Sequence, residues 1–365
     1  MAAPATIPYC AAEITPEWLT AVLREGGHIA DARVTGIERT TIGEGVGFLG
    51  ELTRLELTYE GEAAGAPRSL VSKIPTAFAQ ARAIGNMFRF YEREGRFYED
   101  LAPGLALRVP RCYLSVTDVP GDRYILLLED VCEATVGDQI QGATLEQART
   151  VLRAAAAFHA AFWESPRLQE LSWLPDLLDP IYDPLQGLYQ GSWAAFLELN
   201  PGLPPEIRPI GVRFGEAMEE IRAGGIEPPM SIAHTDFRLD NMLFGRPGSA
   251  PLTVIDWQLM VRANPLIDVG YFLSQSLPIA LRRKHERDLV REYHEGLCAG
   301  GVAGYDFAQC WQDYRRGVMF TFVIPVSGSA NVDLSNPRAV PLLRTLSERS
   351  TAAILDLAAA DTLPG

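Results

Sequence analysis

The sequence predicts an α+β protein of two lobes, a strand-rich first lobe with one inserted helix and a larger helical second lobe. With 365 residues the chain exceeds what one hydrophobic core usually holds. Strand-like patterns dominate to about residue 130, and helical patterns dominate beyond it. We therefore expect a first lobe at residues 1–130 and a second at residues 131–365.

The first lobe begins with a helix and continues as strands. Thr15 can cap that helix, and Pro16 suits its first turn. Strand-like patterning runs through residues 34–74, and a helical aromatic spacing follows in residues 78–101. Two more strands are expected at 111–116 and 123–129. The inserted helix thus lies after the third strand.

The second lobe carries the long helical patterns, which we expect at residues 144–163, 281–297 and 340–360. Residues 164–229 between them are rich in Pro, Trp and Tyr. This stretch is too apolar for a linker, so we interpret it as an insertion that folds onto the second lobe.

The composition of the chain limits the kinds of partner that it could bind. The chain has 32 basic and 46 acidic residues, a net charge of −14 that disfavours binding to nucleic acid or to anionic membranes. Its five cysteines form no CxxC pair, as expected of reduced thiols in a cytosolic protein. The N-terminal residues resemble no signal peptide, and residues 318–326 are too few to cross a bilayer. We expect a soluble cytoplasmic protein.

Only two of the 32 basic residues are lysines, Lys73 and Lys284. Lys73 lies in an apolar strand, where a compact ammonium could reach phosphate oxygens and would need a carboxylate partner. Of the acidic residues in the following helix, Glu94 is our choice. The alternative is an edge-strand lysine with its amine in water. Lys284 lies on a charged helix face and is expected to be solvated.

The stretch at residues 234–241 reads HxDxxxxN. In phosphoryl transfer such an Asp, here Asp236, accepts a proton from the attacking hydroxyl, and the Asn five residues later, Asn241, binds magnesium. Residues 252–257 then form an apolar strand that ends at Asp256, where a second metal ligand is expected. The alternatives are a polar loop and a capping Asp.

Glycines at Gly43, Gly45 and Gly47 precede a strand-like segment at residues 51–57. A GxGxxG pattern from Gly45 to Gly50 suggests a dinucleotide fold, but that fingerprint must open a helix. Glycines between two strands instead suit a flap that closes over nucleotide phosphates. A glycine-rich hairpin without a ligand is the alternative.

With these motifs the chain resembles the aminoglycoside phosphotransferase and choline kinase superfamily, which shares the protein-kinase fold. The resemblance covers about residues 40 to 345. It is nearest to the ecdysteroid-kinase-like branch in three segments, at residues 93–98, 126–130 and 255–258.

The resemblance implies roles for the candidate residues. Asp236 would be the catalytic base and Arg238 would face the γ-phosphate. Asn241 and Asp256 would hold Mg²⁺ on the phosphates of ATP. Lys73, paired with Glu94, would hold the α- and β-phosphates beneath the glycine flap.

The hinge and the loop supports follow from the same resemblance. Residues 128–131, with Glu129 and Val131, would bind adenine through their backbone. Asp268 would brace the catalytic loop, and His234 would be structural. Trp257-Gln258 replaces the Phe-Gly of protein kinases, which favours a small-molecule acceptor. A glycine frequent in antibiotic kinases is absent from residues 261–265, so antibiotic specificity is not assumed.

We expect an ATP- and magnesium-dependent kinase that phosphorylates a hydroxyl of a small molecule, as a monomer or homodimer. The aromatic insertion and residues 319–322 would line a partly apolar acceptor pocket, unless they are core. One alternative is a catalytically inactive nucleotide-binding scaffold. The other is a metal-dependent phosphoesterase that uses His234, Asp236, Asp240 and Asp256.

Overall fold

The computed structural model describes residues 6–43, 49–330 and 336–364 and divides into two compact units. The first unit comprises Met1–Leu105 and Val109–Glu133, and the second comprises Ala106–Arg108 and Ala134–Gly365. The first is rich in strands and the second is mainly helical, which confirms the predicted α+β fold class. The functional division of the chain at residue 130 stays a prediction.

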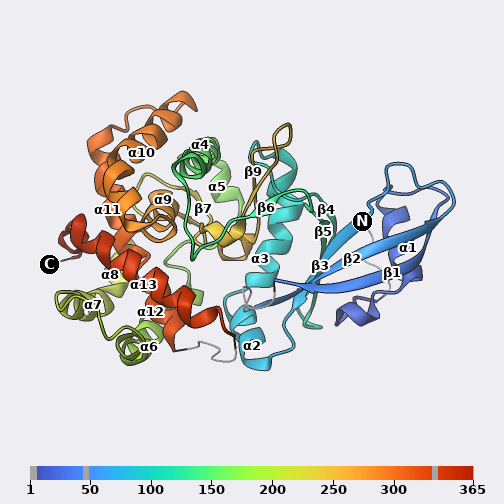
Figure 1. Ribbon diagram of the computed structural model, residues 1–365, viewed down its shortest axis with the longest axis horizontal. Coiled ribbons are helices and arrows are strands. Elements are labelled where there is room, and N and C mark those ends of the chain that lie inside the picture. The colour runs from blue at the N-terminus through green and yellow to red at the C-terminus, as the bar shows by residue number, and fades with distance from the viewer. Residues whose placement is uncertain (1–5, 44–48, 331–335, 365) are drawn as a thin grey trace. The chain divides into compact units, whose positions relative to one another are not determined.

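The first unit is built on a five-stranded antiparallel sheet (Figure 1), in the order β1-β2-β3-β5-β4. Its helices and strands, in chain order, are α1 (Pro16–Glu25), β1 (Arg33–Ile42), β2 (Gly50–Glu60), β3 (Ser69–Pro75), α2 (Ala79–Met87), α3 (Phe90–Arg96), β4 (Cys112–Asp118) and β5 (Arg123–Glu129). Thr15 caps α1, whose Leu19 and Leu23 join Leu55 and Leu70 of the sheet in one buried apolar cluster.

The helix expected at residues 78–101 is interrupted. It forms α2 and α3, and a π-helical turn continues α3 from Phe97 to Leu101. The break is at Arg89, whose φ of 53° lies in the left-handed region that cannot continue a right-handed helix. Helix α3 therefore runs in its own direction, which allows its buried Glu94 to meet strand β3.

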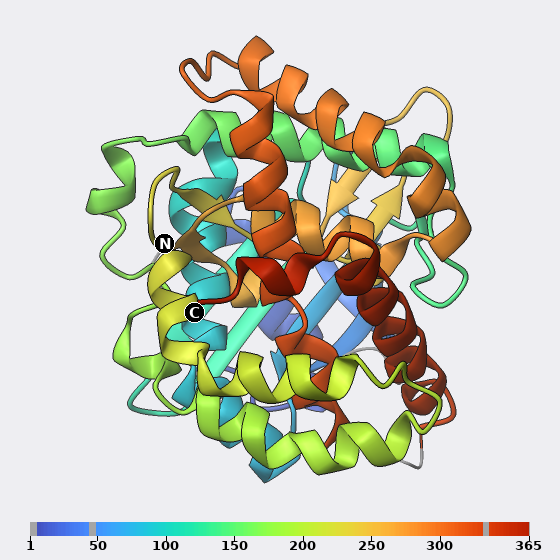
Figure 2. The same cartoon turned by 90° about the vertical axis from the view of Figure 1, so that its left-hand side faces the viewer.

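The second unit consists of helices around two small sheets (Figure 2), one of two strands and one of three. Its elements are β6 (Thr135–Val136), α4 (Leu145–Phe162), α5 (Arg167–Glu170), α6 (Leu185–Leu199), α7 (Ile207–Glu216), α8 (Met218–Gly224), β7 (Ser231–Ala233), β8 (Met242–Phe244), β9 (Leu252–Val254), β10 (Val261–Ala263), α9 (Leu266–Tyr271), α10 (Ile279–Ala299), α11 (Phe307–Phe320), α12 (Val323–Ser329) and α13 (Ala339–Asp356). Helix α4 begins with a capping box, in which Thr144 and Gln147 bond each other's backbone.

Helix α9 is the buried centre of this unit. It packs so closely on α11 that a Cβ atom at Gly270 would lie 2.5 Å from the carbonyl carbon of Gly317. This contact fixes α9 against a long helix, and α9 carries Asp268 and Tyr271, both of which reach the loop after β7. Within the described part of the chain, no helix has the length and apolar character needed to span a membrane.

Candidate functional site

Lys73 lies in the middle of the sheet of the first unit. Strand β3 is paired on both sides, and Lys73 is in register with Leu52 of β2 and Leu126 of β5, so the edge-strand alternative is wrong. Its Nζ is 2.7 Å from Oε2 of Glu94, and the two side chains are 12% and 3% exposed. A buried pair of this kind is costly to break, because either partner alone would be an uncompensated charge. Its role in holding phosphates stays a prediction.

The glycine-rich segment is described only at its ends, because Gly45 and Gly47 lie outside the described residues. Gly43 has a φ of 69°, a conformation that glycine adopts without strain. A Cβ atom at Gly50 would lie 3.4 Å from Cε of Lys73, so this end of the segment passes close over the lysine.

The predicted hinge follows strand β5. The Glu129 backbone N–H donates to the carbonyl oxygen of Arg111 at 2.8 Å, and its carboxylate accepts from the Arg111 N–H at 2.9 Å. Glu129 is therefore engaged within the sheet by both its backbone N–H and its side chain. Val131, two residues later, is half-buried and lies beyond the end of β5. The binding of adenine by these two residues stays a prediction.

In the second unit, Asp268 anchors the loop that begins after β7. Its carboxylate is fully buried and accepts from the backbone N–H groups of His234, at 2.7 Å, and Thr235, at 2.8 Å. Thr235 has a φ of 58°, which costs energy for a β-branched residue. The two charge-assisted hydrogen bonds offset this strain and fix the backbone that leads into Asp236.

Asp236 is held by side chains on either side of it. The Asn241 amide nitrogen donates to Asp236 Oδ2 at 2.7 Å, and the Tyr271 hydroxyl lies 3.3 Å from Oδ1. Burial, and then the charge of Asp236, raise the pKa of Tyr271 well above 10, so its hydroxyl stays a donor at neutral pH. The carboxylate is thus oriented while remaining an acceptor for a further proton.

Arg238 extends this arrangement into a row of alternating charges. Its Nε lies 3.2 Å from Asp236 and its Nη1 lies 2.7 Å from Asp240, which in turn accepts from Arg338 at 2.6 Å. Burial alone would lower the pKa of Arg238, but the neighbouring negative charges, Asp236 foremost, outweigh it and raise that pKa. The guanidinium is therefore charged at any physiological pH.

The two predicted metal ligands come from neighbouring backbone segments. The Ile255 N–H donates to the carbonyl oxygen of Asn241 at 3.0 Å, so Asn241 and Asp256 are brought close along the β8–β9 pair. Asp256 has a φ of 67°, which turns the chain sharply at the end of the strand. An amide oxygen and a carboxylate are hard oxygen ligands that suit Mg²⁺, whose remaining ligands in nucleotide sites are phosphates and water. Among the described residues no cluster of three or more His, Cys, Asp or Glu offers a protein-only metal site.

Both ring nitrogens of His234 form hydrogen bonds within the protein. Its Nε2 bonds the carbonyl oxygen of Ile255 at 3.0 Å, and its Nδ1 accepts from the Asp236 N–H at 3.2 Å. Asp240 is bonded to two arginines. Neither side chain is available as a metal ligand in this arrangement, which weighs against the phosphoesterase alternative.

Some of the aromatic side chains expected to line an acceptor pocket form core instead, whereas others are only half-buried, namely Trp173, Tyr182, Trp193 and Phe320. Tyr189, Phe196, Phe214 and Phe322 are all buried, and their rings contact one another across α6, α7 and the α11–α12 junction. Met319 is equally buried. These residues stabilise the helical insertion, and their apolar character carries no information about an acceptor.

Sequence reasoning missed Tyr271 and Arg338. Tyr271 could have been found, because it lies one helical turn after Asp268 and must share the face that braces the loop. Arg338 immediately precedes α13, nearly a hundred residues after the motif, and no local pattern connects it to Asp240.

The chain is similar to a family model, to solved structures and, over a short stretch, to one curated protein. The model of the phosphotransferase enzyme family matches residues 65–317. Choline kinase from Cryptosporidium parvum Iowa II is 11% identical, with a TM-score of 0.58 over 94% of this chain and 98% of that one. Wild-type aminoglycoside 2'-phosphotransferase-IIIa in its GDP complex is 15% identical, with a TM-score of 0.54 over 92% and 97%. These two likenesses concern the fold.

A curated mouse protein, acyl-CoA dehydrogenase family member 10, is 36% identical over 80 residues, which is 19% of this chain. The match spans 7% of the length of the mouse protein. It is a local similarity within a much longer chain.

Proposed function

Because this chain belongs to the phosphotransferase enzyme family, in the aminoglycoside phosphotransferase and choline kinase superfamily, we propose that it transfers the γ-phosphate of ATP to a hydroxyl of a small molecule. The observation that carries the proposal is the support of Asp236. Its carboxylate is oriented by Asn241 and Tyr271 on a loop that Asp268 anchors, as a base or hydroxyl-orienting group must be. The ecdysteroid-kinase-like branch stays a prediction.

In this proposal catalysis is positioning and charge neutralisation, without a covalent enzyme intermediate. The acceptor oxygen attacks the γ-phosphorus as its proton passes to Asp236, and the electrons of the broken bond leave with ADP. Arg238, held charged by its buried acidic neighbours, stabilises the transferring group. Lys73 contacts the α- and β-phosphates. Asn241 and Asp256 would hold Mg²⁺, which would neutralise phosphate charge.

The acceptor should be sought by testing a panel of hydroxylated compounds of several classes. A panel should contain amino alcohols and aminoglycosides, because the structural neighbours are named for them. It should also contain sterols, and hydroxyacyl thioesters in view of the name of the mouse relative. Both ATP and GTP should be tried, since one neighbour was solved with GDP. We expect a cytoplasmic monomer or homodimer.

The test is nucleoside diphosphate release that depends on both the acceptor and magnesium. Asp236→Asn should lower kcat by about 10³-fold while nucleotide affinity persists, because the amide cannot take the proton. Asp306→Asn is the matched control, since Asp306 caps α11 and asparagine caps equally well. Wild-type turnover by Asp236→Asn would refute the mechanism. Magnesium-independent nucleotide binding without transfer to any acceptor would favour the inactive scaffold.

A further inference from the structure

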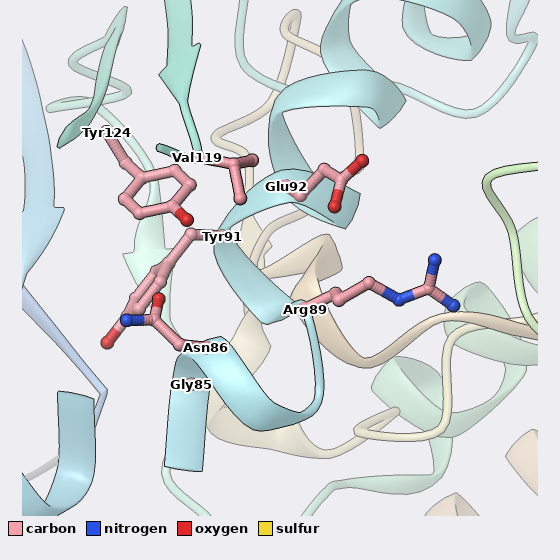
Figure 3. A pocket seen from close by; sticks show the side chains of 7 residues that line it. All are labelled: Gly85, Asn86, Arg89, Tyr91, Glu92, Val119 and Tyr124. Carbon is pink, nitrogen blue, oxygen red and sulfur yellow. The ribbon is translucent and has the colours of Figure 1, made fainter. Parts of the chain in front are cut away.

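A cavity of about 150 Å³ opens in the first unit, where the α2–α3 junction meets the turn between β4 and β5 (Figure 3). It is lined by Gly85, Asn86, Arg89, Tyr91, Glu92, Val119 and Tyr124. None of these residues has a part in the reaction proposed above. The cavity is about the size that holds a single six-membered ring.

Two tyrosines form the wall between this cavity and the lysine. The rings of Tyr91 and Tyr124 are 5.2 Å apart at 40° to each other. Both also line a second, smaller cavity, together with Lys73 and Glu94. A molecule in the outer cavity would therefore touch the rings whose other sides face the ion pair.

Tyr91 connects the cavity to the nucleotide-binding elements in two ways. Its hydroxyl donates to the carbonyl oxygen of Leu49, at the end of the glycine-rich segment, at 2.7 Å. Burial raises the pKa of Tyr91 to about 12, so this donor keeps its proton at neutral pH. Tyr91 also precedes Glu94 by one helical turn of α3, so the position of its ring and that of the Lys73 partner are set by the same helix.

The ring of Tyr91 has no room on the side of α2. A Cβ atom added at Gly85 would lie 2.6 Å from it. Helices α2 and α3 are joined through Arg89 in a left-handed conformation, which few side chains adopt without cost. Tyr91 is thus confined by Gly85 of α2, by the ring of Tyr124 and by its hydrogen bond to Leu49, and it lines the cavity.

The lining indicates the kind of ligand. Two tyrosine faces favour an aromatic ring. Arg89 and Glu92 are both half-buried and carry opposite charges, and their side chains extend away from the two tyrosine rings (Figure 3), so the cavity favours an uncharged molecule. The Asn86 amide nitrogen donates to Asp122 at 2.9 Å, which leaves the amide oxygen to accept from a ligand. A phenol meets all three conditions.

We propose that this cavity binds a small uncharged phenolic ring and that its occupation tightens ATP binding through Tyr91. The second half rests on the proposed function, since it requires ATP to bind at Lys73. A ring packed against Tyr91 and Tyr124 holds α3 in place, and with it the Lys73–Glu94 pair and the Leu49 carbonyl. By linkage, ATP must tighten phenol binding by the same factor.

Phenol itself is the probe, titrated against the whole chain by ligand-observed NMR. For its seven heavy atoms we expect a Kd of about 1 mM. Saturating phenol should lower the Kd for ATP by about threefold, and saturating ATP should lower the Kd for phenol equally. Using Asp236→Asn for both titrations prevents turnover.

Two variants with matched controls localise the effect. Val119→Trp should fill the cavity and abolish phenol binding, whereas Val212→Trp, on α7, should not; the two valines are 52% and 48% exposed. Gly85→Ala should push Tyr91 and weaken ATP binding at least threefold. Gly187→Ala, on α6 with nothing within 4 Å of the added Cβ, should leave it unchanged.

The proposal is overturned if phenol does not saturate, if Val119→Trp binds it as the wild type does, or if the Kd for ATP is the same with and without phenol. These failures differ from failure of the proposed function. If ATP does not bind, the kinase proposal fails while the phenol titration still reports on the cavity. If ATP binds and phenol does not, only the cavity proposal fails.

Discussion

Replacement of Asp268 by asparagine tests the support of the catalytic loop most directly. The carboxylate is fully buried and accepts three hydrogen bonds, from the backbone of His234 and Thr235 and from Nε2 of His159 at 3.2 Å. An amide of the same shape keeps one accepting oxygen and presents an NH₂ group to the remaining donors. At least one buried donor then faces another donor.

The cost follows from these contacts. One charge-assisted hydrogen bond is worth about 1.5–3 kcal/mol, and a buried donor left without an acceptor costs about 1–3 kcal/mol. Thr235 also loses the bond that offsets its left-handed backbone. We therefore expect a loss of about 3 kcal/mol or more in the free energy of unfolding. In a unit of this size, that lowers Tm by about 6–12 °C.

Calorimetry and acceptor-dependent turnover check the two consequences of Asp268→Asn. We expect kcat to fall by about 100-fold or more even below the lowered Tm, because the backbone that aims Asp236 is no longer fixed. Asp306→Asn, an exposed helix cap, should change neither quantity. A Tm within about 1 °C of the wild-type value, or an unchanged kcat, would show that Asp268 does not hold the loop.

Three further substitutions test the buried lysine, the second arginine on Asp240 and an ion pair on α13. Lys73→Arg keeps the charge but not the compact ammonium, so we expect turnover to fall by about 10²-fold while circular dichroism shows an intact fold. Arg338→Gln leaves Asp240 with one arginine, so steady-state kinetics should show kcat about tenfold lower at an unchanged KM for ATP. Burial alone would raise the pKa of Asp356, but its arginine partners lower it, so the stability it contributes is present above about pH 4 and lost as the pH falls further. Urea unfolding of Asp356→Asn should show a deficit of about 1–3 kcal/mol at pH 7 that shrinks towards pH 3.

The fold class could be predicted because it depends on helix and strand patterns that are local in the sequence. The strand patterning that ends at residue 74 and the cap at Thr15 are set by neighbouring residues alone, and the structure has both. The break at Arg89 could not be predicted, because nothing in an arginine requires a left-handed backbone. Tyr91, two residues after the break, packs against Gly85 of α2, a contact between neighbouring helices that no local pattern predicts.

The aromatic insertion shows why an acceptor pocket could not be predicted from the sequence. The aromatic content of residues 164–229 predicted a folded insertion, but a helix that lines a pocket and a helix that fills a core are equally apolar. Only contacts from elsewhere decide, here the ring of Phe322 against Trp193 and Phe196. The acceptor must therefore be found by experiment and not from hydrophobicity.

The charges of the catalytic loop also predict a partner outside the loop. Asp236, Arg238 and Asp240 are together one negative charge in excess, and the structure buries all three side chains at least four-fifths. Because an uncompensated buried charge is costly, a second cation had to come from outside the loop. Twenty-nine other arginines could have supplied it, and chain topology selects Arg338. A charge excess within a buried motif thus predicts that a distant partner exists, and the fold alone identifies it.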